Sequence, residues 1–206
     1  MRQPQSVKGL EELGRVRLSA SFFMRDFLYS EIATIHGLPN IPDDPDLAIA
    51  AGMALCENLL EPLQARFGRI SIRSAFRSCA VNQFGNLNKL NCASNEANYA
   101  GHIWDRHDAE GRMGATACVV VNSFVPYYER TTDWEALAWF VHDHLPYSEM
   151  EFFPKLAAFN LTWSEAPKRR ISSYIPPRRG VLTRPEMDNA TGRHDSAYAT
   201  MLAEIG

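Results

Sequence analysis

The first third of the chain contains two stretches of apolar residues at helical spacing. The first stretch follows Ser21, a residue type that caps helices, and ends before Gly37. The second follows Asp44 and Pro45, an acidic residue and a proline of the kind that begin helices, and ends at Gly68. The apolar positions are Met24, Leu28, Ile32 and Ile35 in the first stretch, and Ile49, Met53, Cys56, Leu60, Leu63 and Phe67 in the second. We therefore predict two helices, of which the second is long and faces the core.

The rest of the chain adds the patterns of β-strands. Ile70 and Ile72 alternate with polar residues, as in a strand with one buried face, and residues 117–121 form the continuous apolar run of a buried strand. Three more strands are predicted at residues 150–153, 159–163 and 171–174. Asp133 precedes another helical pattern, made by Trp134, Leu137, Ala138, Val141 and Leu145. A short helix is predicted around Val81 and Phe84, followed by a loop.

These elements predict an α+β fold in which a small antiparallel sheet packs against helices. Residues 1–18 are polar without periodicity and are predicted to be a lead-in segment. Residues 19–175 are predicted to form the domain. Residues 176–206 are rich in proline, arginine and glycine at their start and are predicted to be an extended or partly disordered tail.

Composition excludes several classes of protein. With 206 residues, 46% of them hydrophobic, the chain is long enough for one domain with a substantial core. A net charge of -3 gives no basic surface for nucleic acid, and no apolar stretch is long enough to span a membrane. The N-terminus lacks the apolar core of a secretory signal, and the four cysteines show no paired spacing. We therefore expect a cytoplasmic protein, released by a phage lysis system if it acts on the cell wall.

The strand at residues 70–74 leads into a polar turn that carries Ser74, Arg77, Ser78 and Asn82. A guanidinium pairs well with a carboxylate or phosphate, and hydroxyl and amide groups add neutral donors. The turn therefore indicates an edge that recognises an anion. The alternative interpretation is a surface turn in which the arginine pairs locally.

The order of motifs around this turn resembles the zinc D-Ala-D-Ala carboxypeptidases with the Hedgehog-like fold, in their phage and bacterial single-domain branch. In that family a Gly-x-x-Asn-x-Pro loop, a helix reading Leu-Glu-Pro-Leu-Arg and a strand running into Ser-Gly-Tyr-Arg-Ser-x-x-x-Asn follow one another. This chain has corresponding residues at 37–42, 60–64 and 74–82. The resemblance is good over residues 22–84 and patchy to about residue 175. It implies a Hedgehog-like fold and hydrolysis of a peptidoglycan peptide by zinc-bound water, with Arg77 near the cleft.

The resemblance also implies zinc ligands, which this chain does not keep. The family motif Ser-x-His-x-x-Gly-x-Ala-x-Asp aligns with residues 109–118, so that Gly111 and Cys118 replace the histidine and aspartate. The family's second histidine aligns with Leu161. We therefore predict a rebuilt metal site that uses His102, His107 and Cys118, since a thiolate can bind zinc. The alternative interpretation of the segment from His102 to Asp108 is a polar loop with local ion pairs.

Other candidate groups lie further along the chain. Glu149 and Glu165 are located near the last predicted strands, and either carboxylate is a candidate general base. Together with Arg77 they are the candidate catalytic residues. His142, Asp143 and His144 are a weaker metal candidate, because histidine is favoured in a last helical turn for electrostatic reasons alone.

Two functional hypotheses follow from the sequence. The first is a peptidase-like hydrolase that binds a peptidoglycan-type peptide or another carboxylate ligand through Ser74, Arg77, Ser78 and Asn82. The second is a non-catalytic binding protein, or a phage-type structural protein, on the same fold.

Overall fold

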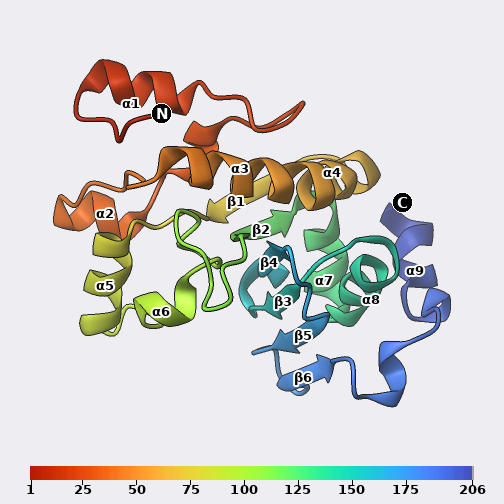
Figure 1. The fold of residues 1–206 in the computed structure, drawn as a ribbon. Helices are drawn as coiled ribbons and strands as arrows, with labels where there is room; N and C mark the ends of the chain where they lie inside the picture. The colour runs from red at the N-terminus through yellow and green to blue at the C-terminus, as the bar shows by residue number, and fades with distance from the viewer. Residues whose placement is uncertain (206) are drawn as a thin grey trace. The chain divides into compact units, whose positions relative to one another are not determined.

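The computed structural model describes residues 1–205, and Figure 1 labels its helices and strands. The chain forms two compact units. The first unit consists of Met1–Glu57 and Ser74–Ala117. The second consists of Asn58–Arg73 and the described chain from Cys118 onward. The chain therefore enters each unit twice, whereas the sequence predicts a single continuous domain.

The first unit is helical. Its elements are α1 (Val7–Gly14), η1 (Met24–Phe27), α2 (Glu31–His36), α3 (Pro45–Leu55), α5 (Cys79–Leu87) and α6 (Asn95–Asn98). Its core surrounds the fully buried Trp104, whose ring lies 5.3 Å from that of Phe27 and 6.2 Å from that of Phe76. The indole nitrogen donates to the carbonyl of Thr116, at 3.1 Å. Burial of these large rings contributes to the unit's apolar stabilisation.

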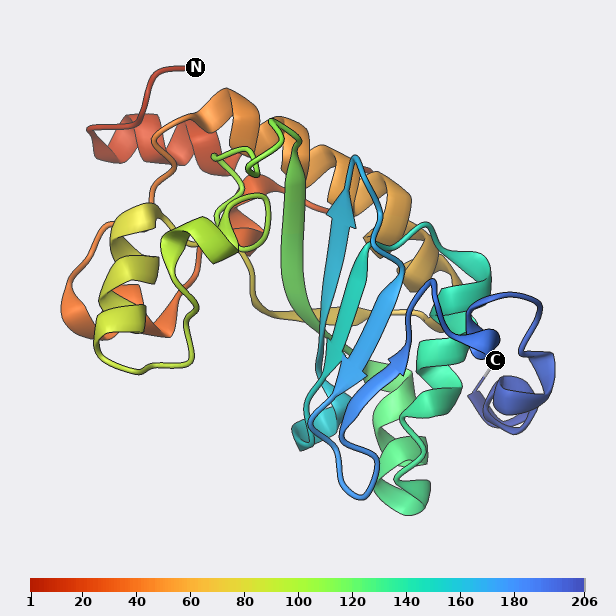
Figure 2. The same cartoon turned by 60° about the horizontal axis from the view of Figure 1, so that its bottom comes forward.

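The second unit contains most of a six-stranded sheet in the order β1-β2-β4-β3-β5-β6. The strands are β1 (Ile70–Ser74), β2 (Gly114–Val121), β3 (Glu149–Phe152), β4 (Phe159–Ser164), β5 (Arg170–Ser173) and β6 (Gly180–Thr183). The order places β4 and β3 at the centre. Strand β3 is antiparallel to β4 and parallel to β5, while β6 lies antiparallel to β5 at one edge (Figure 2). This confirms the predicted α+β class.

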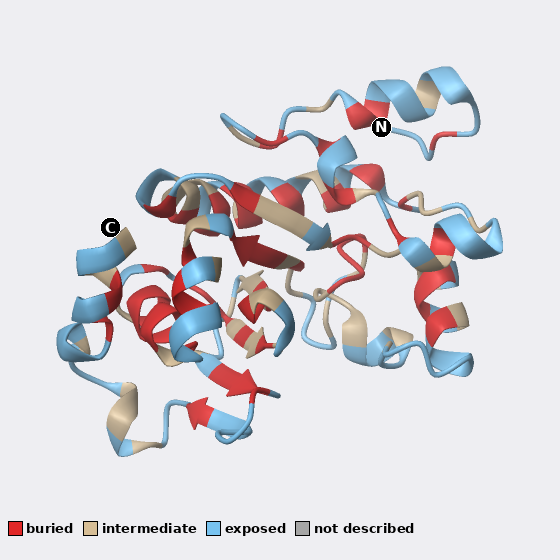
Figure 3. Cartoon of the chain, turned by 180° about the vertical axis from the view of Figure 1, so that it is seen from behind, coloured by how far each residue is buried: buried red, intermediate tan, exposed pale blue. Residues whose placement is uncertain are grey.

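The remaining elements of the second unit are helical. They are η2, a π-helix (Cys56–Leu60) that begins in the first unit, α4 (Glu61–Phe67), η3 (Asn122–Phe124), α7 (Val125–Thr131), α8 (Glu135–His144), η4 (Lys155–Ala157), η5 (Asp188–Ala190) and α9 (Asp195–Ile205). Helix α8 is buried at every position from Ala136 to His142. Figure 3 colours the chain by burial, with buried residues in red. A helix buried on all sides needs cover on each face, and α9 supplies part of it: the ring of Tyr198 on α9 lies 5.5 Å from that of Phe140 on α8.

Two predicted helices are interrupted in the structure. The first predicted helix covers both η1 and α2. The two are separate because Ser30 starts a new helix by accepting a hydrogen bond from the backbone N–H of Ala33, at 3.3 Å. The second prediction spans α3, the π-helix and α4. Pro62 lacks an N–H, and the wider π turn lies just before it.

The two ends of the chain are more regular than the sequence predicts. The predicted lead-in contains α1, and the predicted tail contains β6, η5 and α9 among its described residues. Helix α9 has a buried face at Tyr198 and Met201, which is why a short and weakly amphipathic segment is ordered. No helix of the described chain is long and apolar enough to cross a membrane.

Candidate metal centre

Two histidines and an aspartate converge in the second unit. His142 and Asp143 lie in the last turns of α8, and His194 immediately precedes α9. One ligand atom from each residue lies within 4.8 Å of the others. Among residues 1–205, these three side chains form a group of histidine and carboxylate ligands that could hold a metal ion. In a tetrahedral zinc site, donors about 2.1 Å from the ion are about 3.4 Å apart. The ligand atoms would therefore have to approach one another by up to about 1.4 Å to share one ion.

Asp143 holds His194 in place with both carboxylate oxygens. Oδ2 accepts the backbone N–H of His194 at 2.7 Å, and Oδ1 lies 2.8 Å from Nδ1 of the ring. The ring stacks on Trp139, with centroids 3.9 Å apart and planes 14° from parallel. Its Nε2 lies 3.1 Å from the carbonyl oxygen of Asn189. Both ring nitrogens thus face acceptors, so both hydrogen bonds form together only when each nitrogen carries a proton.

His142 is held by a tyrosine and a backbone carbonyl. Its Nδ1 lies 2.7 Å from the Tyr147 hydroxyl, and its Nε2 lies 3.2 Å from the carbonyl of Ala190. A carbonyl can only accept, so Nε2 carries the proton and the hydroxyl of Tyr147 donates to Nδ1. Because a hydroxyl can also accept, Tyr147 can support the other tautomer, which leaves Nε2 free to bind a metal.

Burial and neighbouring charges set the protonation of this group. Burial lowers the pKa of His142, and the nearby Arg169 guanidinium lowers it further, so the imidazole is held neutral. Burial alone would raise the pKa of Asp143, but hydrogen bonds from His194 outweigh it and hold that pKa below its usual value. Burial also raises the pKa of Tyr147. A neutral imidazole and an ionised carboxylate are the forms that bind metal ions.

A polar pocket of about 390 Å³ adjoins the group. Trp139 and Asn189, which both contact His194, are among the residues that line it. The lining residues are Trp134, Trp139, Arg178, Arg179, Gly180, Val181, Leu182, Met187 and Asn189. Arg178 pairs with Glu135, whereas Arg179 has no carboxylate within 4.0 Å among the described residues. The pocket therefore offers aromatic walls and one cation without a carboxylate partner.

The donors fit zinc. Two imidazoles and one carboxylate are a ligand set that zinc uses in proteins, with one position left for a water molecule. The side-chain oxygen Oδ1 of Asn189 is buried and has no hydrogen-bond partner, so the site also holds an acceptor that is not satisfied within the protein. Tyr147 contacts His142 as a group that orients a metal-binding imidazole does, and Asp143 is either the third ligand or the group that orients His194.

The predicted anion-binding residues lie in the first unit, where several of them bond within the fold. Ser78 caps α5 and donates to the carbonyl of Pro39 at 3.1 Å. Asn82 is fully buried, donates to Ala93 and Asn95, and accepts from Asn98. Ser74 ends β1, and no described contact involves its side chain. These bonds give Ser78 and Asn82 a structural use.

Arg77 is the charged residue of that turn. Its backbone N–H donates to the carbonyl of His102 at 2.8 Å, and its guanidinium donates to the sulfur of Cys92 at 3.4 Å. Within residues 1–205 no carboxylate lies within 4.0 Å of the guanidinium, whose described partner is the sulfur of Cys92.

The residues of the predicted metal site are distributed over both units. His102 and His107 belong to the first unit and Cys118 to the second. The ring of His102 is buried, with Nδ1 2.7 Å from the carbonyl of Ala75, whereas His107 is exposed. Asp105, in the same segment, accepts the backbone N–H of Asp43 at 2.6 Å. None of these residues belongs to the group that could hold a metal ion in the described chain.

The two candidate bases lie in the second unit. Glu149 on β3 pairs with Lys168 at 2.8 Å and with Arg170 at 3.8 Å, as a solvated charge on the polar face of a strand does. Glu165 follows β4 and is exposed. Neither belongs to the group around His142.

Sequence reasoning weighed His142 and Asp143 only together with their neighbour His144, and it missed His194. His144 instead contacts the hydroxyl of Tyr198, at 3.2 Å. The pattern of α8 gives no sign of a partner 51 residues away, and His194 stands alone in a segment predicted to lack structure. The available signal was Asp195, an acidic residue of the kind found in the first turn of a helix, which would have placed His194 at the start of a helix.

Comparison of the chain with protein-family models, with curated proteins and with solved structures finds no match.

Proposed function

We propose that the protein binds zinc at His142, Asp143 and His194 and acts as a metal-dependent hydrolase on a ligand that carries a carboxylate. The convergence of three ligand atoms within 4.8 Å carries the proposal. The adjoining pocket, with Arg179 in its lining, supports an anionic ligand. The resemblance of residues 22–84 to the zinc D-Ala-D-Ala carboxypeptidases suggests a peptidoglycan-type peptide as the substrate and a Hedgehog-like fold.

Each residue of the site has a distinct part in this proposal. His142 and His194 would bind the ion through imidazole nitrogens, with Tyr147 orienting the first ring. Asp143 would bind directly or orient His194, since its carboxylate already contacts that ring at 2.8 Å. Arg179 would hold the substrate carboxylate, and the indole of Trp139 would form an apolar wall. Bound zinc supplies a Lewis acid and lowers the pKa of a water molecule.

Zinc content of the purified protein, measured together with two variants, tests the metal site. We expect about one zinc per chain in the wild type, loss of most of it in His194→Ala, and no loss in His107→Ala. His107 is exposed and is the histidine of the sequence-predicted site, so it is a matched control that also separates the two sites. Circular dichroism of each variant separates loss of metal from loss of fold. Zinc that is retained in His194→Ala and lost in His107→Ala contradicts the proposal.

Incubation of the zinc-loaded protein with a peptide that ends in D-Ala-D-Ala tests the activity. Release of D-Ala that depends on zinc and falls at least tenfold in Arg179→Gln supports the proposal. Arg184→Gln is the control, since Arg184 is an exposed arginine that follows β6 and does not line the pocket. Zinc binding without cleavage favours the second candidate.

The second candidate is a non-catalytic binding protein, or a phage-type structural protein, on the same fold. The hydrogen bonds of the His142 group favour it, because every ring nitrogen of His142 and His194 contacts an acceptor or a hydroxyl. Gly111, Cys118 and Leu161 at the positions of the family's zinc ligands favour it too. It predicts that Arg77→Ala changes ligand binding or stability while no peptide is cleaved, and zinc-dependent cleavage excludes it.

A further inference from the structure

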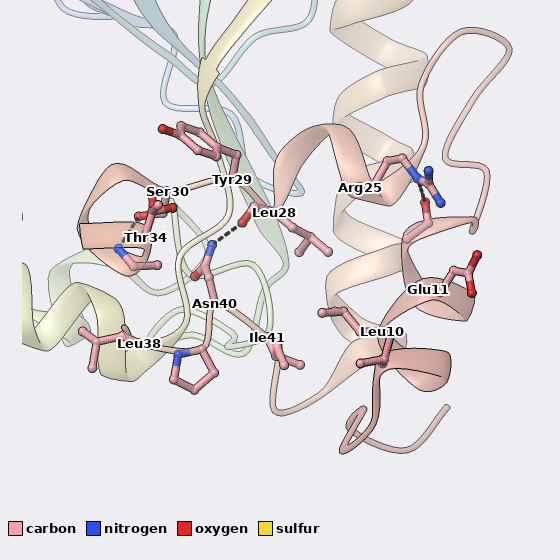
Figure 4. A pocket seen from close by; sticks show the side chains of 14 residues that line it. Leu10, Glu11, Arg25, Leu28, Tyr29, Ser30, Thr34, Leu38, Asn40 and Ile41 are labelled. Atoms are coloured by element: carbon pink, nitrogen blue, oxygen red, sulfur yellow. Dashed lines mark hydrogen bonds between the residues drawn. The ribbon is translucent and has the colours of Figure 1, made fainter. Parts of the chain in front are cut away.

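The first unit contains a cleft of about 710 Å³ that is unrelated to the metal centre. Helices α1 and η1 and the segment from Leu28 to Ile41 form its walls (Figure 4). Its lining residues are Val7, Leu10, Glu11, Gly14, Arg25, Leu28, Tyr29, Ser30, Ala33, Thr34, Leu38, Pro39, Asn40 and Ile41. Pockets of this volume with mostly apolar linings are typical sites for small molecules.

The apolar lining includes large side chains that face solvent. Val7 is 88% exposed and Tyr29 is 59% exposed, and Leu10 on the same face of α1 is 39% exposed. Scattered exposed apolar residues are common, but here they surround one concave surface. A ligand with an apolar body would remove this surface from water, which is favourable in proportion to the area covered.

One charged group on the cleft lacks an opposite charge. The guanidinium of Arg25 donates through Nε to the carbonyl of Gly14, at 3.3 Å, and no described carboxylate lies within 4.0 Å of it. Figure 4 shows this side chain pointing to the end of α1. Glu11, the acidic residue of the lining, already pairs with Arg15 at 2.5 Å. The cleft therefore presents one positive charge that a ligand anion can pair with.

Three of the four neutral polar side chains of the lining are used within the fold. Ser30 caps α2, and the Thr34 hydroxyl donates to the carbonyl of Ser30 at 2.9 Å. The amide of Asn40 donates to the carbonyls of Leu28 and Phe76, at 3.0 and 2.9 Å. These three groups have no need of a partner on the ligand. The chemistry left for recognition is an apolar wall with one guanidinium and the hydroxyl of the exposed Tyr29.

We propose that this cleft binds a ligand with an aliphatic chain and one terminal carboxylate. The chain lies along Leu10, Leu28 and Ile41, and the carboxylate pairs with Arg25. The complementary charge of Arg25 selects an anion over a neutral ligand. The side chains of Ser30, Thr34 and Asn40 bond within the fold and leave few partners for the amides of a peptide, which favours a simple alkyl chain. This proposal is independent of the metal centre.

Titration calorimetry with dodecanoate, kept below its micelle concentration, tests the proposal. We expect one saturable site on the wild-type protein and about ten- to a hundredfold weaker binding to Arg25→Gln, because a charge-assisted pair is lost. Lys8→Gln removes an exposed cation of the same helix α1, whose partner Glu12 does not line the cleft, and should bind dodecanoate as the wild type does. Leu10→Asp places a charge in the apolar wall and should weaken binding regardless of the head group.

Dodecanol separates the two parts of the recognition. It should bind the wild type and Arg25→Gln equally, since it lacks the charge that Arg25 pairs with. Dodecanoate binding that is unchanged in Arg25→Gln, or that does not saturate, overturns the proposal. Binding of an apolar peptide with a free carboxyl terminus in place of dodecanoate overturns it as well. Circular dichroism and thermal melts show whether each variant is folded.

Discussion

The side chain of Asn82 makes three hydrogen bonds in a position with no exposed surface. Its Nδ2 donates to the carbonyl of Ala93 at 3.1 Å and to Oδ1 of Asn95 at 2.9 Å, and its Oδ1 accepts from Nδ2 of Asn98 at 2.8 Å. These bonds tie α5 to the segment around α6. A polar group buried in this way is costly to leave without partners.

Asn82→Ala should therefore destabilise the protein by about 2–3 kcal/mol, since it leaves the Ala93 carbonyl and the Asn98 amide without their partner. Gln83→Ala, at the exposed neighbouring position of the same helix, should change stability by less than about 0.5 kcal/mol. Urea unfolding of both variants measures the difference. Equal midpoints for Asn82→Ala and the wild type would falsify the structural role.

Glu151 on β3 should make stability depend on pH. Burial raises the pKa of its carboxyl above the ordinary value of 4.5, and the nearby Glu149 adds to the effect, against the opposing charge of Arg170. A raised pKa means that the folded state holds its proton to higher pH than the unfolded state does. The contribution to the free energy of unfolding is therefore present below about pH 4.5 and is lost as pH rises through the folded-state pKa.

Glu151→Gln removes this titration while keeping the shape of the side chain. The melting temperature of the variant, minus that of the wild type, should increase between pH 4 and pH 7. Glu57→Gln, at an exposed position, gives the baseline for removing one negative charge. A difference that stays constant or decreases over this pH range is the result that excludes the burial effect.

At the scale of elements, helix α3 is held close to the core by a glycine. A Cβ added at Gly52 would lie 2.9 Å from Cζ3 of Trp104 and 3.1 Å from Cδ1 of Leu18. Both distances are shorter than packed carbon atoms tolerate. Alanine is ordinarily the better helix former, by about 1 kcal/mol, so this position reverses the usual preference.

Gly52→Ala should destabilise the protein by about 1–3 kcal/mol, because α3 or the indole must shift to admit the methyl group. The double variant Gly52→Ala/Leu18→Ala should lose less than the sum of the two single changes, since one of the two clashes is gone. Urea unfolding of the four proteins measures the coupling. Exact additivity of the two changes contradicts the predicted contact.

The elements show which parts of the structure local sequence determines. The alternation at residues 70–74 and the apolar run at 117–121 predicted β1 and β2, because strand patterns are local. The break between η1 and α2 was not predicted, since it depends on Ser30 as a cap and on Asn40, which bonds to Leu28 from 12 residues away. The candidate metal centre was missed for the same reason: Asp143 and His194 are 51 residues apart, and only the packing of α9 on α8 joins them.

At the scale of the whole molecule, each unit has its own core and its own candidate site. The first unit contains the cleft at Arg25 and a core around Trp104. The second contains the His142 group and a core in which Phe152 and Phe159 stack at 4.6 Å. No residue is shared between the two sites. Sites that share no residues are expected to respond independently to substitution.

Cross-titration of the two variants checks this independence. His194→Ala should bind dodecanoate with the affinity of the wild type, and Arg25→Gln should retain the zinc content of the wild type, within about a factor of two. Titrating dodecanoate into the wild type with and without zinc measures any coupling directly. If zinc changes the affinity for dodecanoate tenfold, dodecanoate must change the affinity for zinc by the same factor, because coupling between two binding equilibria is reciprocal. A coupling of that size would mean that the two units respond to their ligands as one body, and the absence of coupling would mean that the chain combines two separate binding functions.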